Sequence, residues 1–133
     1  MKPGEKFEEK CWIVNGDSET ASWGLNLSGL FTLLIKTAGE ECLGYASDLL
    51  YDIDEMKADL RNAESFRKSK RYSNGPDGTE RLTYALGFRD YGVDHKEWID
   101  VRLTGYKEIV EITFELGRGF VLVRAERVGE GAA

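Results

Sequence analysis

Acidic residues recur at helical spacing within one segment of the chain. Five carboxylates belong to the series: Glu41, Asp48, Asp52, Glu55 and Asp59. Each stands one residue before an apolar residue. Those apolar residues belong to a longer series at alternating steps of four and three: Cys42, Ala46, Leu49, Ile53, Met56, Leu60 and Ala63. Because an α-helix advances about 100° per residue, this spacing predicts an acidic stripe beside an apolar one.

A face of carboxylates can bind a divalent metal, bind a basic protein surface or simply face water. The Asp52-x-x-Glu55 pair has the spacing of carboxylates in magnesium-dependent nucleotide pyrophosphatases, but the chain holds no second pair of this kind. The segment Asp52-Ile53-Asp54-Glu55 also lacks the central glycine and distal glutamate of a calcium-binding loop. The sequence therefore favours solvent or a basic partner over metal, and it predicts no cofactor. On this basis the candidate partner-binding acids are Asp48, Asp52, Glu55 and Asp59.

Other reactive side chains give no catalytic pattern. His95 is the single histidine and lies in a segment that reads as a turn, where the sequence predicts an exposed side chain. Cys11 and Cys42 fall on predicted apolar faces and are expected to be small buried hydrophobic residues. The chain contains no nucleophile elbow, phosphate-binding loop, dinucleotide fingerprint or Cys-x-x-Cys pair. The sequence thus favours a non-enzymatic protein and predicts no catalytic residue.

A basic segment at 67–72 could contact phosphates, an acidic protein patch, or the negative end of its own helix. Four positive charges on an acidic protein are a weak nucleic-acid signal, so direct binding to nucleic acid is not favoured. Trp98 is a second candidate for partner contact. It alternates with Ile99, Val101 and Leu103, which places it on the opposite, polar face of a predicted strand, where it is either a partner anchor or covered by the loop at 73–79.

The composition is that of a globular, highly charged domain. The 133 residues carry a net charge of −6, and 41% of them are hydrophobic. Residues 1–66 have a net charge of −7 and residues 67–133 of +1, so the acidity lies in the half with the acidic stripe. A negative field attracts basic protein surfaces. Two cysteines, no signal peptide and no apolar run of about 20 residues predict a cytoplasmic protein without a membrane segment.

The periodicity changes from helical to alternating along the chain. We expect an α+β fold with an N-terminal strand, two helices, and a four-stranded antiparallel meander packed on the helices. One domain is expected over 1–128, with a disordered tail at 129–133. The expected elements are a strand at 7–14, helices at 27–38 and 40–66, a loop at 73–79, and strands at 82–88, 98–103, 110–116 and 121–125.

These features predict an acidic protein-binding module whose partner presents a basic surface. In size and composition the chain is similar to small inhibitors carried by phages and mobile elements, such as anti-CRISPR proteins, and to immunity proteins of nuclease toxins. That similarity implies an inhibitor that occupies a nucleic-acid-binding surface. Two alternatives stay open. One is a small-ligand or metal-dependent nucleotide-acting enzyme with a helix–sheet pocket. The other is a homo-oligomer that pairs through the apolar stripe at 42–63; the sequence does not fix the oligomeric state.

Overall fold

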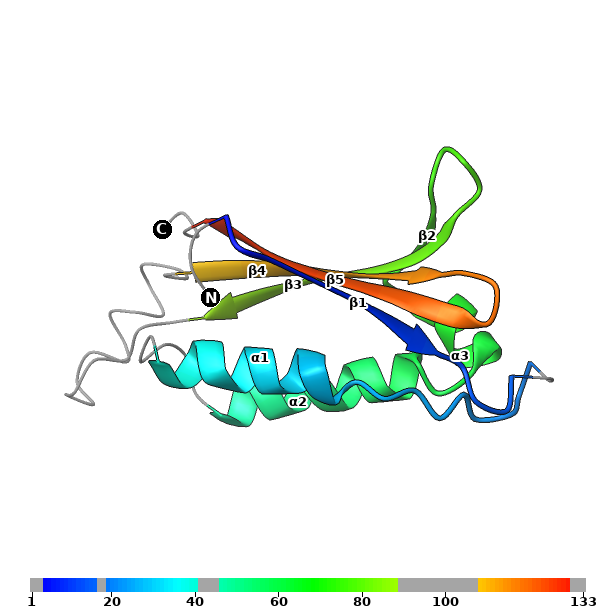
Figure 1. The fold of residues 1–133 in the computed structure, drawn as a ribbon, viewed down its shortest axis with the longest axis horizontal. Coiled ribbons are helices and arrows are strands. Elements are labelled where there is room, and N and C mark those ends of the chain that lie inside the picture. The colour runs from blue at the N-terminus through cyan, green and yellow to red at the C-terminus, as the bar shows by residue number, and fades with distance from the viewer. Residues whose placement is uncertain (1–3, 17–18, 41–45, 89–107, 130–133) are drawn as a thin grey trace.

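An antiparallel sheet with helices on one of its faces forms the framework of the protein (Figure 1). The computed structural model describes residues 4–16, 19–40, 46–88 and 108–129. Within these ranges one strand is followed by three helices and then by four strands, so the architecture is α+β, as the sequence predicts. Within the described ranges no helix is long and apolar enough to cross a membrane.

The five strands in the described part of the chain pair in the order β1-β5-β4-β3-β2, which brings the first of them beside the last. Their bounds are Lys6–Trp12 (β1), Tyr72–Asn74 (β2), Glu80–Phe88 (β3), Glu108–Leu116 (β4) and Phe120–Gly129 (β5). The expected strands at 7–14, 82–88, 110–116 and 121–125 correspond to β1, β3, β4 and β5. The strand expected at 98–103 lies outside the described residues.

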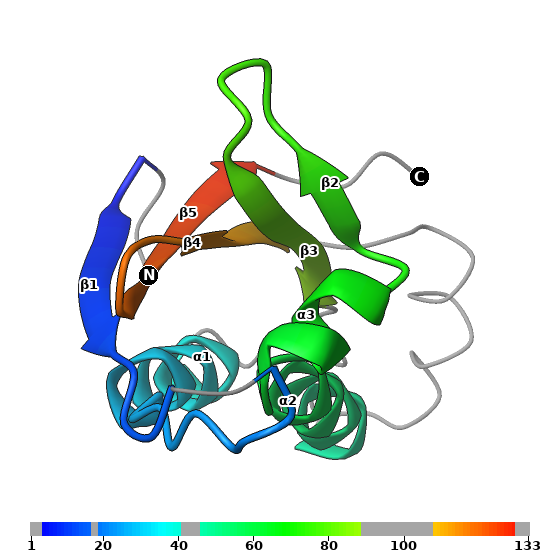
Figure 2. The same cartoon turned by 90° about the vertical axis from the view of Figure 1, so that its right-hand side faces the viewer.

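The sheet curves around two helices, α1 (Ser28–Glu40) and α2 (Ala46–Asp59), which lie side by side against its inner face (Figure 2). Alternate residues of the central strands point inward and are buried. They include Leu82, Tyr84 and Leu86 from β3, Val110, Ile112 and Phe114 from β4, and Val121, Val123 and Ala125 from β5. Because the period of a strand is two, the intervening residues form the outer face of the sheet. Of the elements that the structure describes, the helices thus cover one sheet face and none covers the other.

The side chain of Asn26 satisfies the first backbone N–H group of α1. The side-chain oxygen of Asn26 accepts hydrogen bonds from the backbone N–H of Ser28 at 3.1 Å and from its hydroxyl at 2.7 Å. Gly39 lies within α1 rather than ending it. Leu30 and Leu34 on α1 are buried, and so is the described part of the predicted apolar stripe on α2 and beyond. The stripe residues that the structure shows buried are Leu49, Ile53, Met56, Leu60 and Ala63.

The single helix expected over 40–66 is wrong, because the chain leaves the helix after Asp59. A short helix, α3 (Ala63–Lys68), follows with Asn62 as its N-cap. Asn62 is extended, with φ of −159°, and its side-chain oxygen accepts the N–H of Ser65 at 2.8 Å. Its amide group donates to the carbonyl of Thr20 at 3.0 Å. The break is stabilised because the buried side-chain amide of Asn62 has hydrogen-bond partners there and because Phe66 is buried in the core.

Two smaller expectations also change. The loop expected at 73–79 is shorter, because β2 pairs with the start of β3 in a hairpin whose connection is residues 75–79, where Gly78 adopts φ of +80°. Gly129, expected in a disordered tail, ends β5, where it pairs with Ile109 on β4. Both differences come from strand pairing, which local composition does not show.

Candidate protein-interaction surface

Two acids of the predicted partner-binding stripe already have partners within the fold. Glu55 forms an ion pair and hydrogen bond with Arg71, and Lys70 Nζ lies 3.8 Å from the same carboxylate oxygen. The side chains of Glu55 and Arg71 are 19% and 25% exposed, so the pair is largely shielded from solvent. At this position the acidic stripe therefore connects α2 to the basic segment that leads into β2.

Asp59 lies at the centre of a second polar contact between α2 and the sheet. Its carboxylate accepts hydrogen bonds from the hydroxyl of Ser69 at 2.9 Å and from the hydroxyl of Tyr84. The Arg71 guanidinium lies 4.4 Å from the centre of the Tyr84 ring, within range of a cation–π contact. Burial, reinforced by Asp59, raises the pKa of the Tyr84 hydroxyl well above its ordinary value. Tyr84 therefore remains a neutral donor to Asp59 at physiological pH.

For the other two candidate acids, Asp52 and Asp48, the structure gives less detail of the side-chain contacts. Asp52 is half-buried on α2 and interacts within the protein. Asp48 belongs to α2, but its side chain lies outside the described part. The structure thus brings Glu55 and Asp59 to the sheet rather than to solvent. The assignment of the four acids as partner-binding residues stays a prediction.

The basic segment also forms contacts within the molecule. Arg67 donates to Glu80 on β3 and to Glu19 in the segment before α1, each at 2.7 Å, and Lys68 pairs with Glu64. The hydrogen bonds from Arg67 lower the pKa of the Glu80 carboxyl. The bond from Arg67 to Glu80 thus joins α3 to the sheet, whereas Lys70 and Arg71 pair with Glu55 on α2.

The remaining candidates do not form a reactive site in the described structure. Cys11 is buried, its thiol donates to the carbonyl of Asn26 at 3.3 Å, and burial raises its pKa. Cys42, His95 and Trp98 lie outside the described residues. Among the side chains that are described, no three of His, Cys, Asp or Glu are grouped so that they could hold a metal ion.

An open hollow of about 200 Å³ lies between the segment before α1 and the end of α2. Its lining residues are Ser22, Gly24, Leu25, Leu27, Lys57, Leu60 and Arg61. The lining contains no carboxylate and no histidine. It therefore differs from the acid-lined pocket that the enzyme alternative requires, and that alternative stays a prediction.

The most exposed tryptophan in the described structure lies at the end of β1. Trp12 is 63% exposed on the outer face of the sheet, and its cross-strand partner is Phe120. The two rings meet edge to face with centroids 5.6 Å apart. Lys10 Nζ lies 4.4 Å from the centre of the Phe120 ring and 5.3 Å from that of Trp12. We call these three residues, Lys10, Trp12 and Phe120, the Trp12 surface.

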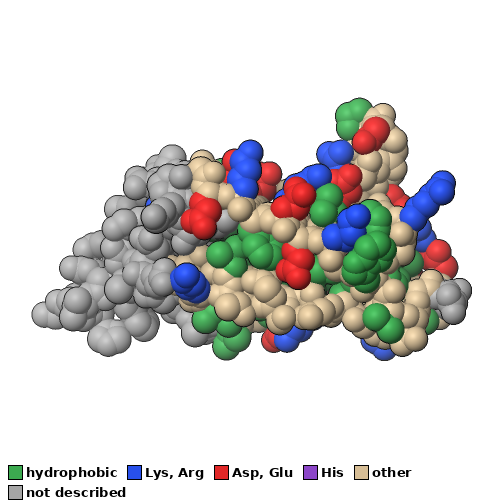
Figure 3. All heavy atoms as spheres, viewed as in Figure 1, with side chains coloured by type: hydrophobic (Ala, Val, Ile, Leu, Met, Phe, Trp, Pro, Cys, Tyr) green, Lys and Arg blue, Asp and Glu red, His purple; other side chains and the backbone are tan. Residues whose placement is uncertain are grey.

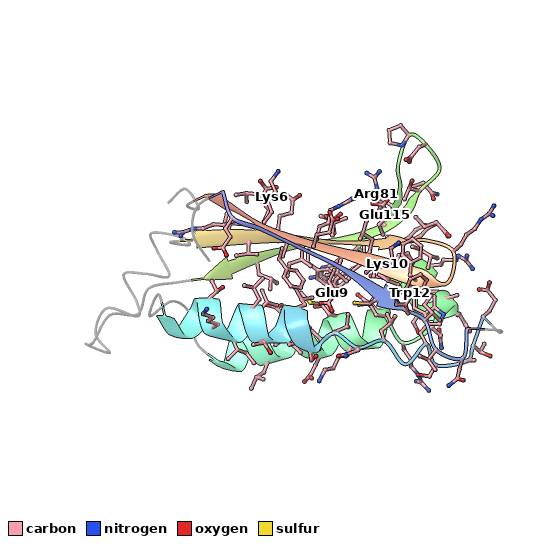
Figure 4. The ribbon with its side chains drawn as sticks, in the orientation of Figure 1. Lys6, Glu9, Lys10, Trp12, Arg81 and Glu115 are labelled. Atoms are coloured by element: carbon pink, nitrogen blue, oxygen red, sulfur yellow. The ribbon has the colours of Figure 1, made fainter. Side chains whose placement is uncertain are left out.

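Figures 3 and 4 show the setting of this surface. Hydrophobic side chains gather near the end of β1 with a basic side chain over them (Figure 3), and Lys10 and Trp12 lie close together there (Figure 4). Farther along the outer face, charges pair across the strands. Arg124 on β5 contacts Glu8 on β1 at 3.0 Å and Glu115 on β4 at 2.8 Å. The Trp12 surface is thus an aromatic patch bordered by a charged sheet face.

Sequence reasoning missed Trp12, although a signal for it was present. Along β1, Trp12 has the same parity as Lys6, Glu8 and Lys10, whereas the buried Cys11 has the opposite parity. Because successive side chains of a strand alternate between faces, a tryptophan in register with three charged residues must lie on the solvent face. The alternation of β1 was thus sufficient to expose it.

Comparisons of the chain with protein-family models, with curated proteins and with solved structures found no match.

Proposed function

We propose that this protein is a non-enzymatic protein-binding module and that a partner contacts its Trp12 surface. The observation that carries the proposal is the 63% exposure of Trp12 on a strand that is hydrogen-bonded into the sheet. Tryptophan is among the residue types that contribute most binding free energy at protein interfaces. Phe120 and Lys10 restrict the ring before binding, so less conformational entropy is lost when a partner covers it.

The charge of the protein supports a partner with a basic surface. The net charge is −6, and residues 1–66 have a net charge of −7, most of it on α2, whereas β1 itself is neutral. Complementary charge increases the rate at which two proteins meet and disfavours acidic competitors. In its narrower form the proposal is that the protein inhibits its partner in the cytoplasm by covering a nucleic-acid-binding surface, with Asp48 and Asp52 contributing to the acidic field.

The test compares capture by the tagged wild-type protein, Trp12→Ala and Tyr51→Ala. Tyr51 is the matched control, because it is 68% exposed but lies on α2, in the helical layer. Each protein is incubated with nuclease-treated lysate, and retained proteins are identified by mass spectrometry at low and high salt. The retained partner is then purified and its dissociation constant is measured for all three proteins.

We expect Trp12→Ala to weaken the affinity by at least about tenfold and Tyr51→Ala to leave it nearly unchanged. The thermal midpoint of Trp12→Ala should remain close to that of the wild type, because the side chain is exposed. Equal affinities for Trp12→Ala and the wild type would contradict the proposal, as would the absence of any stoichiometric partner at both salt concentrations.

A further inference from the structure

The open edge of the sheet lies beside the Trp12 surface. Among the described residues, β1 is the last strand on its side of the sheet, as Figure 2 shows, and pairs only with β5. In an antiparallel pair, residues whose backbone bonds to the neighbour alternate with residues whose backbone points away. Ile13 donates its N–H to the carbonyl of Gly119 at 2.9 Å. The alternation therefore directs the backbone groups of Lys6, Glu8 and Lys10 away from β5.

Just past the end of β1, the outward series already makes one backbone hydrogen bond. Val14 is the next residue in this series after Trp12, and its N–H donates to the carbonyl of Trp23 at 2.8 Å. Toward Lys6, β1 is the outermost strand of the part of the chain that the structure describes.

The charged side chains on the outer face of β1 differ in what they contact. Lys6 and Glu8 pair with β5, through Glu126 at 3.8 Å and Arg124 at 3.0 Å. Lys10 instead lies over the two aromatic rings of the Trp12 surface.

Glu9, the residue before Lys10, lies on the inner face of β1, between the sheet and α1 (Figure 4). It is half-buried, and its carboxylate lies against the first turn of α1. A Cβ atom on Gly29 would lie 2.6 Å from its oxygen. The edge therefore presents a positive charge on its outer face and, one residue away, a negative charge on its inner face.

We propose that the partner adds an extended segment to β1 as a sixth, antiparallel strand. The segment would carry an acidic side chain opposite Lys10 and a basic side chain opposite Glu9. In antiparallel pairing these two positions are consecutive, with the acid first. Backbone hydrogen bonds to Glu8 and Lys10 supply affinity, and the acid–base order supplies specificity. This inference rests on the proposed function and specifies how the partner is recognised.

A second copy of the chain fits this edge less well. An antiparallel pair of β1 strands that matches Glu8 with the second Lys10 also places Glu9 directly opposite the second Glu9. Like charges directly opposite each other destabilise a strand pair. The charges therefore favour a different protein as the occupant.

The first test uses a designed peptide, acetyl-Thr-Val-Glu-Lys-Thr-Val-Thr-amide, titrated into the isotopically labelled full chain. We expect amide resonances of Lys6, Glu8 and Lys10 to shift in a saturable manner at millimolar peptide. The control peptide exchanges the central Glu and Lys, which places like charges opposite both residues, and we expect it to bind about tenfold more weakly. No shift with either peptide, or equal affinity for both, would overturn the proposal.

The second test compares Glu8→Pro with Glu8→Ala. Both variants lose the ion pair with Arg124, but proline also removes the outward N–H that a sixth strand needs. Edge strands tolerate proline where the N–H faces away from the sheet, so the bonds between β1 and β5 are retained. We expect the two variants to have similar thermal midpoints. Glu8→Pro should bind both the peptide and the captured partner at least about tenfold more weakly than Glu8→Ala.

The outcomes separate this inference from the proposed function. A partner that loses affinity for Trp12→Ala but binds Glu8→Pro and Glu8→Ala equally would overturn strand addition and leave the proposed function in place. A partner unaffected by Trp12→Ala would contradict the proposed function itself. Concentration-dependent dimerisation of the wild type that Glu8→Pro abolishes would place a second copy on the edge and overturn the inference. If Glu8→Pro does not fold, the peptide titration of the wild type decides.

Discussion

At the scale of single residues, acids that look equivalent in the sequence have different roles in the structure. Asp59 accepts hydrogen bonds from Ser69 and from Tyr84, which lies 25 residues away on β3. Glu55 pairs with Arg71. Both contacts are partly buried, where an unpaired carboxylate or hydroxyl costs more free energy than it does in water. These two acids therefore stabilise the attachment of α2 to the sheet.

This arrangement predicts that Tyr84→Phe lowers the free energy of unfolding by about 1–2 kcal/mol. The substitution retains the buried ring and its edge-to-face contact with Phe114 but removes one hydrogen bond to Asp59. Asp59→Ala should cost about 1–3 kcal/mol, because it leaves the Tyr84 and Ser69 hydroxyls without this acceptor. Urea denaturation followed by circular dichroism measures both values. The double variant should lose less than the sum, and additive losses or an unchanged Tyr84→Phe protein would contradict the contact.

The same contacts affect how the acidic stripe should be tested. Reversing Glu55 or Asp59 to lysine places a positive charge beside Arg71 or beneath Tyr84, so it perturbs folding as well as surface charge. A loss of partner binding in such a variant would not identify a contact with the partner. Trp12, whose exposed side chain contributes little to the core, gives a cleaner separation between folding and binding.

At the scale of helices and strands, Asn62 divides the expected helix in two, because it starts α3 as a separate helix after α2 has ended at Asp59. Its side chain caps α3 and also donates to the carbonyl of Thr20, and it is 7% exposed. It thereby fixes both the start of α3 and the path of the segment before α1.

We predict that Asn62→Ala lowers the free energy of unfolding by about 2 kcal/mol, because it removes the cap and leaves the Thr20 carbonyl without that donor. Asn62→Asp is the matched control, since a carboxylate retains the capping acceptor but cannot donate to Thr20. We expect Asn62→Asp to be intermediate in chemical denaturation. Equal stability of Asn62→Ala and the wild type would show that the break does not depend on the cap.

Sequence periodicity predicted α1, β1, β3, β4 and β5, but it missed β2, the end of α2 and which faces meet. The apolar stripe from Leu49 to Ala63 continues in phase through the break, so it gave no sign that α2 ends at Asp59. The local sign was Asn62, a residue type favoured at N-caps. The partners of Glu55 and Asp59 depend on how β2 and β3 pair, and this is not a property of the helix alone. Trp98, the predicted aromatic anchor, lies outside the described residues, so its role stays a prediction.

At the scale of the whole molecule, the two layers leave different surfaces to a partner. The helices cover the inner sheet face and form the core, whereas the outer face carries alternating charges that end at the Trp12 surface (Figures 3 and 4). Of the net charge of −7 in residues 1–66, α2 carries the largest share, with five acids and one lysine, whereas β1 has two lysines and two glutamates and is neutral. A partner that approaches the end of β1 therefore meets an aromatic anchor on a molecule whose negative charge is concentrated on α2.

This combination predicts that charge and contact affect different rate constants of partner binding. Raising the ionic strength from about 0.05 M to about 0.5 M should slow association by roughly tenfold or more, because screening shortens the reach of the negative field. Dissociation should change much less. Trp12→Ala should instead speed dissociation and leave association nearly unchanged, since the ring acts only after contact. Stopped-flow or surface-binding kinetics with the purified partner measure both constants. An association rate that does not depend on salt would show that the acidic half of the chain does not steer the partner, and it would restrict recognition to the Trp12 surface and the edge of β1.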